Sequence, residues 1–270
     1  MSNRWIKVDQ QDGVVTVTLN DPDTLNAVNH EMNREIAAEM ERVDRDDEAR
    51  VLILTGEGRG FCSGGNIKVM TGQGKSIMPP LQSPRTELFP HFIDICQIVY
   101  GLRRLSKPAI AAVNGPCVGS GIGLAAGCDI RIASEQARFG WVFVRRGLLP
   151  DDGSLPLVPQ IIGYANAFEW GATGRILSAQ EALDMGFVRQ VVPHDQLLPT
   201  CVDLAREILE TCPPISLELF KLALAESLTM TPEQAILMGD KAQLIARATE
   251  DHTEALRAFA EKRKPVWKRK

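Results

Sequence analysis

GFCSGGNI at residues 60–67 and NGPCVGSGIG at residues 114–123 decide the fold of this chain. Each glycine-rich segment follows a short apolar run, at residues 51–54 and 109–113, and each precedes a plausible helix. Glycine allows close approach of the backbone to a ligand, and a helix N-terminus offers unpaired N–H groups. The pair therefore predicts two strand-to-helix turns whose amides converge on developing negative charge, as in an oxyanion hole.

Length and charge bound the class of protein. The 270 residues, 44% of them hydrophobic and 24% charged, suffice for one large domain or for a domain with a smaller appendage. A net charge of −4 gives no global signature of nucleic-acid binding. Residues 262–270 are locally basic, which is typical of a solvated helix end.

The cysteines do not predict a metal site. None of the six forms a CxxC pair or lies near a histidine pair, so we expect free thiols in a reducing compartment. The N-terminus has no apolar signal core, and no stretch is long enough to span a bilayer. We therefore expect a cytoplasmic protein.

Alternating segments predict a wound α/β architecture. β-branched residues at 14–19 predict a strand, near-helical apolar spacing from 29 to 43 predicts a helix, and 51–54 predict a buried strand, which together form a β-α-β unit. Further strands are expected at 109–113 and 129–133, and helices at 91–105 and 121–126. Repeated right-handed units of this kind build a parallel sheet.

The last third of the chain predicts mostly helices. After a helix closed by Gly186 and a strand at 188–192, helices are expected at about 195–210, 215–227 and 232–259. Leu222, Leu237 and Ile245 are expected to pack in ordinary core positions. Residues 71–90 mix Gly, Pro, Ser and Gln without periodicity, which favours a mobile flap over a binding pocket, with disorder as the alternative.

Taken in order, these motifs resemble the crotonase (enoyl-CoA hydratase/isomerase) superfamily from Trp5 to nearly the C-terminus. The motifs that carry the resemblance are TLNDP at 18–22, LNA at 25–27, FCSGGNIK at 61–68, KPAIAAVNG at 107–115, CDIRIA at 128–133 and EKRKP at 261–265. The resemblance implies an α/β fold in which a ββα superhelix, or spiral, at residues 1–195 holds the acyl-CoA site. It also implies a C-terminal helical trimerisation region at 196–270, and thus a homotrimer or a hexamer built as a dimer of trimers.

The resemblance assigns the glycine-rich turns to an acyl-CoA thioester. The amides of Gly65 and Ser120 would stabilise its enolate, each contributing roughly 3 kcal/mol. Ser120 departs from the family's usual glycine, but the backbone amide supplies the hydrogen bond. The expected substrate and coenzyme A contacts are Leu25, Asn26, Ala27, Ser63, Gly64, Gly65, Asn66, Ile67 and Phe143, and Asn66 stands where relatives commonly carry Asp. Coenzyme A enters as part of the substrate, so no metal or redox cofactor is implied; the basic tail could meet its phosphates.

The acid and base positions decide the reaction. True hydratases of this superfamily hold a water between two glutamates, and those positions are Gly123 and Phe143 here, which disfavours hydration by that route. Asp151, in GLLPDDG at 147–153, resembles the single carboxylate of superfamily isomerases, which directly follows a proline. Asp152 is interpreted as a capping or solvated acid. We expect Trp141, Phe143, Leu148 and Leu149 to form an apolar wall around Asp151.

Several functions remain open on the sequence. The leading hypothesis is an enoyl-CoA isomerase that moves a double bond from the 3-position to the 2-position through Asp151. An enoyl-CoA hydratase is one alternative, and a dehalogenase or C–C hydrolase in which Asp151 acts as nucleophile or water-activating base is another. A catalytically silent acyl-CoA or RNA-binding scaffold is the third. His91, beside the 71–90 segment, is the one histidine considered as an accessory acid.

Overall fold

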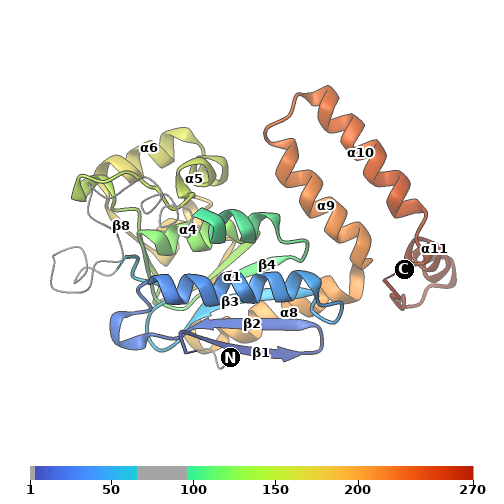
Figure 1. Ribbon diagram of the computed structural model, residues 1–270, viewed down its shortest axis with the longest axis horizontal. Coiled ribbons are helices and arrows are strands. Elements are labelled where there is room, and N and C mark those ends of the chain that lie inside the picture. The colour runs from blue at the N-terminus through green and yellow to red at the C-terminus, as the bar shows by residue number, and fades with distance from the viewer. Residues whose placement is uncertain (1–3, 66–95, 270) are drawn as a thin grey trace.

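A six-stranded sheet forms the centre of the computed structural model, which describes residues 4–65 and 96–269 (Figure 1). Its strand order is β1-β2-β3-β4-β6-β9. The strands are β1 (Ile6–Gln11), β2 (Val14–Leu19), β3 (Val51–Gly56), β4 (Ala109–Val113), β6 (Ile130–Ser134) and β9 (Gln190–Val192). β1 and β2 form an antiparallel hairpin, and every later pairing is parallel. The predicted parallel α/β architecture is confirmed.

The central sheet is covered on both faces. β2 pairs in parallel with β3 through the crossover helix α1 (His30–Arg45), which buries Met32, Ile36 and Val43 against one face. On the other face, α8 (Leu197–Thr211) packs Leu197, Cys201 and Ala205 against the alternate side chains of the same strands. Because both faces are buried, β3 is apolar almost throughout, as expected of a central parallel strand.

A smaller sheet leads away from the second glycine-rich turn. It consists of β5 (Pro116–Val118), β7 (Arg138–Gly140) and β8 (Ile176–Ser178), in the order β5-β7-β8. The helices of this half are α4 (Ser120–Gly127), α5 (Ser154–Ile162), α6 (Tyr164–Thr173) and α7 (Ala179–Asp184), with 3-10 turns η1 (Pro22–Thr24), η2 (Val144–Arg146) and η3 (His194–Gln196). The Phe187 ring meets Trp170 of α6 edge to face at 5.3 Å and Phe139 of β7 edge to face at 5.6 Å, so it packs between α6 and this sheet.

The C-terminal helices form an arm that projects from the body of the molecule. α9 (Pro214–Ser227) and α10 (Pro232–Arg247) make the hairpin at the upper right of Figure 1, and α11 (Glu250–Glu261) follows it. The expectation of one helix over 232–259 is wrong. The helix ends after Arg247, and the Thr249 side chain accepts a hydrogen bond from the His252 amide, which starts a new helix.

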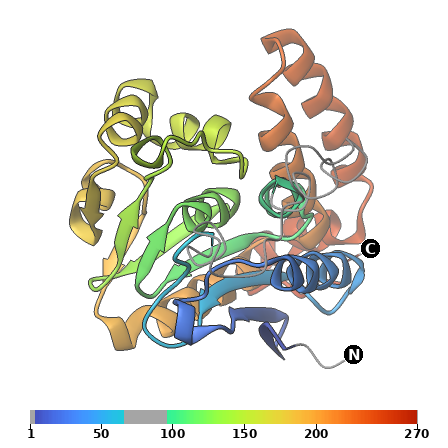
Figure 2. The ribbon, with the colours of Figure 1, turned by 60° about the vertical axis from the view of Figure 1, so that its left-hand side comes forward.

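Apolar side chains of the arm face outward. Leu237 and Ile245 are 61% and 55% exposed, and α10 has no buried residue. The expectation that these two side chains pack in the core is therefore wrong. Figure 2 shows the hairpin projecting from the body of the molecule in a second view. Phe259, on α11, is a further large apolar side chain of the arm, and 87% of its surface is exposed.

Buried lysines fasten the arm to the sheet. The Lys221 ammonium, on α9, lies 2.8 Å from an Asp129 carboxylate oxygen and donates to the carbonyls of Leu102 and Lys107 at 3.0 and 2.7 Å. Lys107 in turn pairs with Glu218 of α9 at 3.0 Å. The division of the chain at residue 195 stays a prediction; α8, which follows it, packs on the central sheet.

The basic tail folds back onto its own chain. Arg263 pairs with Glu254 at 2.6 Å, Lys264 with Glu210 at 2.7 Å, and Arg269 with Glu218 at 2.7 Å. These cations thus have carboxylate partners within the protomer, which weakens the interpretation of the tail as a binding segment for phosphates or RNA. All six cysteines are free thiols, as predicted. Among the residues described, no helix has the length and apolarity needed to cross a membrane.

Candidate active site

The structure brings the two glycine-rich turns together. The amides of Phe61 and Cys62 both donate to the Pro116 carbonyl, at 3.1 and 3.0 Å, and the Val118 amide donates to the Cys62 carbonyl at 2.9 Å. Cys62 and Cys117 form a parallel bridge between the turns. Segments more than fifty residues apart are therefore joined by backbone hydrogen bonds just before each turn opens.

Two glycines allow this close approach because they have no side chain. A Cβ atom on Gly64, whose φ is 88°, would lie 2.7 Å from the Val118 carbonyl oxygen and 3.4 Å from the Ser120 nitrogen. A Cβ atom on Gly121 would collide with the Cys62 carbonyl oxygen. Glycine at these two positions is thus required for the first turn to lie against the N-terminus of α4.

The two expected oxyanion donors lie at this junction. Ser120 is the first residue of α4, so its amide has no partner within the helix. Gly65 follows directly after Gly64, whose carbonyl accepts from the Val28 amide at 2.9 Å. Within residues 4–65 and 96–269, neither the Gly65 nor the Ser120 amide donates a hydrogen bond. Both amides thus lie at the junction of the two turns without a hydrogen-bond acceptor among the described residues.

The segment 25–27, expected to contact coenzyme A, lies against the first turn. The Ser63 amide donates to the Leu25 carbonyl at 2.9 Å, and the Ser63 hydroxyl donates to the Thr24 carbonyl at 2.7 Å. The buried Ala27 amide donates to the Thr24 hydroxyl at 3.1 Å. Of the expected contact residues, Leu25 and Ser63 thus remain half-buried at this edge, whereas Ala27 is enclosed.

Asn26 has a structural task that the sequence did not reveal. Its side chain is fully buried; the amide nitrogen donates to the carbonyls of Gly60 and Glu57 at 2.7 and 3.0 Å, and its oxygen accepts from the Asp21 amide at 2.8 Å. A contact from Asn26 to coenzyme A would have to come from its backbone. The expectations for Asn66, Ile67, His91 and the 71–90 flap lie outside the described residues.

The two aspartates of the 147–153 loop have opposite environments. Asp151 is exposed, whereas Asp152 is completely buried. The Asp152 Oδ1 atom accepts from the Ser154 amide at 3.0 Å and from the Ser154 hydroxyl at 2.6 Å. Asp152 thus accepts from the first helical amide of α5, but Gly153 holds the N-cap position and α5 has no side-chain cap, so Asp152 is not the N-cap residue. The alternative of a solvated acid is wrong, because Asp152 is buried.

The expected apolar wall around Asp151 forms only in part. Trp141 is buried, with its indole N–H donating to the Ser154 hydroxyl at 2.9 Å, and Phe143 is half-buried against the core. Leu148 and Leu149 are 46% and 75% exposed, so they do not enclose Asp151 within the described structure. The left-handed Gly147, which ends η2, turns the following segment outward.

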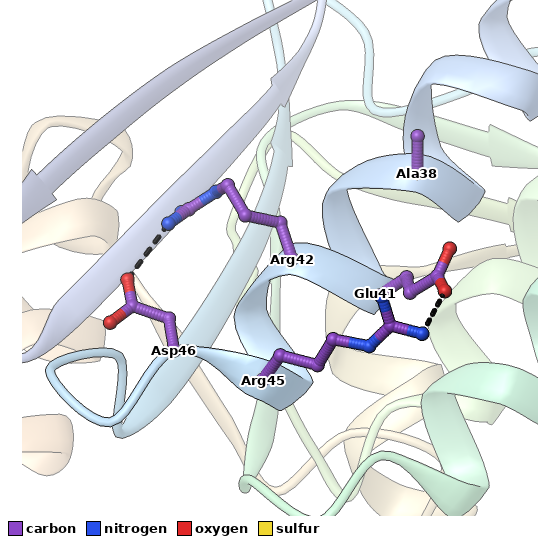
Figure 3. Close-up of a pocket in the computed structure, with 5 residues that line it drawn as sticks. All are labelled: Ala38, Glu41, Arg42, Arg45 and Asp46. Atoms are coloured by element: carbon purple, nitrogen blue, oxygen red, sulfur yellow. Dashed lines mark hydrogen bonds and ion pairs between the residues drawn. The ribbon is translucent and has the colours of Figure 1, made fainter.

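Other cavities lie away from this junction. Figure 3 shows one of about 470 Å³ on the outer face of α1, lined by Ala38, Glu41, Arg42, Arg45 and Asp46. Its charged side chains pair with each other, Arg42 with Asp46 at 2.9 Å and Arg45 with Glu41 at 2.6 Å. No expected site residue lines it. Across the described ranges, no three His, Cys, Asp or Glu side chains are grouped as a metal site would require.

Comparison with known proteins gives a consistent result over the whole chain. Residues 9–270 match the family described as Enoyl-CoA hydratase/isomerase. The 1,2-epoxyphenylacetyl-CoA isomerase of Escherichia coli K12 is 37% identical over 254 residues, which is 94% of each chain. Enoyl-CoA hydratase EchA19 of Mycobacterium tuberculosis is 34% identical over 96% of this chain and 94% of its own. The crystal structure of an enoyl-CoA hydratase from Bacillus anthracis superposes with a TM-score of 0.90 at 30% identity, covering 99% of this chain and 100% of the other.

Proposed function

Because the chain belongs to the enoyl-CoA hydratase/isomerase family of the crotonase superfamily, we propose that it isomerises a 3-enoyl-CoA to the 2-enoyl-CoA through one carboxylate, that of Asp151. The observation that carries the proposal is the junction of the first glycine-rich turn with the N-terminus of α4. There the Gly65 and Ser120 amides, which donate to no acceptor among the described residues, lie at the start of α4, and Gly123 of the same helix contacts Asp152 of the 147–153 loop.

The reaction needs one proton shuttle and an oxyanion hole. Asp151 removes a proton from C2 of the substrate, and the charge moves to the thioester oxygen. The amides of Gly65 and Ser120 donate hydrogen bonds to this oxygen of the dienolate. Return of the proton to C4 leaves the double bond between C2 and C3. Atoms balance without water or an oxidant, so we propose no resident cofactor; coenzyme A comes and goes with the acyl group.

The residues at the acid and base positions favour isomerisation over hydration. Gly123 and Phe143 stand where the resemblance places the two hydratase glutamates, and neither side chain carries an exchangeable proton. The names of the relatives do not decide between the reactions, because the one at 37% identity is named for an epoxide isomerase and others at 34% are named hydratases. Dehalogenase or C–C hydrolase chemistry through Asp151 remains the alternative if isomerisation fails.

We expect the wild-type protein to convert a short 3-enoyl-CoA to its conjugated 2-isomer, with rising absorbance of the conjugated thioester. Hydration of the corresponding 2-enoyl-CoA, followed as loss of that absorbance in a parallel sample, should be at least tenfold slower, because a single carboxylate is a poor match for holding and activating water. Hydration at an equal or greater rate would contradict the single-carboxylate mechanism.

We also propose that the C-terminal arm buries its apolar surface against neighbouring subunits, as a homotrimer or a dimer of trimers. The support is the exposure of large apolar side chains along α9, α10 and α11: Phe220, Leu224, Ile236, Leu237, Leu244, Ile245, Leu256 and Phe259. Large exposed apolar side chains gathered on one arm of a chain are typical of an interface. The cytoplasmic location stays a prediction from the sequence.

Sedimentation equilibrium should give a mass three or six times the 29.7 kDa of the chain. Leu244→Glu places a charge on a side chain that is 69% exposed in the protomer, and it should lower the mass to that of smaller species. Leu198→Glu, at a 42% exposed position on α8, is the matched control and should leave the mass unchanged. A monomeric wild type would exclude the proposed assembly.

A further inference from the structure

A buried carboxyl lies where α4 lacks a side chain. A Cβ atom on Gly123 would be 2.6 Å from Asp152 Oδ2 and 2.9 Å from Asp152 Cγ. The Asp152 carboxyl thus occupies the space in which any residue larger than glycine would begin its side chain. Gly123 belongs to the first turn of α4, the same turn that presents the Ser120 amide.

One half of this carboxyl is fixed and the other half has no partner. Oδ1 accepts both hydrogen bonds from Ser154, whose hydroxyl also accepts from the indole of Trp141. Oδ2 is buried, and no hydrogen-bond donor or acceptor of the described residues reaches it. An orphan buried carboxyl oxygen is rare in folded proteins, and it costs free energy in a purely structural role.

The charges around Asp152 disfavour its ionised form. Burial raises the pKa of Asp152, the two hydrogen bonds from Ser154 oppose that shift, and the charge of Asp151 adds to it. The other titratable groups that face Asp152 are the thiols of Cys62, Cys96 and Cys117, all of them acids. No Lys, Arg or His of the described ranges forms an ion pair with it. These surroundings raise the pKa of Asp152 and so favour its protonated form more than water does.

We propose that Asp152 is a positioning residue whose buried carboxyl fills the space left by Gly123 and thereby fixes the Asp151 loop against the first turn of α4. The inference rests on the proposed role of Asp151. The sequence by itself indicates only a capping or solvated acid next to the predicted base. The signal that could have identified it is Gly123 itself, because a missing side chain in a packed first turn leaves a space that another group must fill.

The opposite side of the loop is clamped as well. The Cys96 thiol, on the helical segment 96–104, donates to the Asp151 carbonyl at 2.6 Å. A Cβ atom on Gly153 would lie 3.1 Å from Val99 of the same segment. Asp151 is thus held between this helix and α4, and Asp152 supplies the contact with α4. Loosening that contact should displace the Asp151 carboxylate from the reacting carbon.

The first test needs no substrate. A carboxyl whose pKa is raised by folding stabilises the protein fully below the pKa of the unfolded chain, and that contribution is lost as pH rises through the folded-state pKa. Asn has no proton to lose. From about pH 4 upward, the urea midpoint of the wild type should therefore fall relative to that of Asp152→Asn. Parallel pH profiles of the two proteins would overturn the raised pKa of Asp152 and the proposal with it.

The second test separates positioning from folding. Asp152→Ala should lower kcat by about tenfold to a hundredfold, because a displacement near 1 Å is enough for such a loss, and should change KM less than twofold. Asp152→Asn keeps the shape and the acceptor for Ser154, so it should recover most of that kcat. Unchanged kcat in Asp152→Ala, or equal losses in both variants, would overturn the positioning role.

Asp151→Asn distinguishes this failure from failure of the proposed function. If that variant loses turnover while Asp152→Ala keeps it, Asp151 is the base and Asp152 does not position it. If Asp151→Asn itself retains turnover, the proposed function fails and the positioning role is overturned with it. The urea experiment then still reports whether folding raises the pKa of Asp152.

Discussion

Asp151→Asn is expected to lower kcat for isomerisation by about a hundredfold to ten-thousandfold, the usual contribution of a general acid or base. The amide keeps the size of the side chain but cannot take a proton from C2. Because Asp151 is exposed and its side chain makes no hydrogen bond within the described structure, the substitution should leave the fold unchanged. Affinity for a nonreactive acyl-CoA, measured by calorimetry, should stay within about threefold, since the thioester contacts the amides of Gly65 and Ser120.

The matched control is Asp9→Asn, an equal change of charge at an exposed position on β1. It should leave kcat and acyl-CoA affinity as in the wild type. A kcat of Asp151→Asn within threefold of the wild type would exclude Asp151 as the base. In that case halide release from a halogenated acyl-CoA, or ring-opened acid from a cyclic diketone thioester, becomes the next assay.

Lys221→Met is expected to reduce the free energy of unfolding by about 3 kcal/mol. The side chain is 7% exposed, and its ammonium holds together the Asp129 carboxylate and two backbone carbonyls. Methionine fills the space but leaves all three oxygens without this donor. Asp129 has a 24% exposed side chain and keeps a hydrogen bond from the Ala109 amide, so the loss should fall at the lower end for a broken buried pair.

For a chain of this size, that loss corresponds to a Tm about 6–12 °C lower, which differential scanning calorimetry measures directly. Lys241→Met removes the same charge from an exposed site on α10 where the described structure records no ion pair, and it should move Tm by less than about 2 °C. Equal Tm values for the two variants would show that Lys221 does not fasten the arm.

Local patterns predicted the parallel strands of the central sheet because these strands have a distinct composition, whereas β1 (Ile6–Gln11) was not among the predicted strands. The β-branched run at 14–19 and the apolar run at 51–54 are strands β2 and β3, and the amphipathic segment between them is α1. The glycines of the two turns identified the junction because backbones can meet at that distance only without Cβ atoms, as Gly64 and Gly121 show. These features are encoded by neighbours in the sequence.

Features that depend on distant neighbours were not predictable in the same way. Leu237 and Ile245 have helical spacing whether they face a core or another subunit, so the pattern alone could not place them outside the protomer. Asp151 and Asp152 are adjacent identical residues, and only the position of α4 makes one exposed and the other buried. The break between α10 and α11 depends on one threonine cap within a run of good helix formers.

The contact between Gly123 and Asp152 also restricts how this site can diverge. With the Asp152 carboxyl in place, a glutamate at position 123 would force its Cβ atom to 2.6 Å from Oδ2, so that substitution alone should be harmful. Once Asp152 is shortened to alanine or glycine, the same glutamate has room to enter. A lineage that moves between a reaction with one loop carboxylate and a reaction with a glutamate on α4 would therefore have to change Asp152 before Gly123. In the reverse order the intermediate protein would be harmed, and selection would remove it.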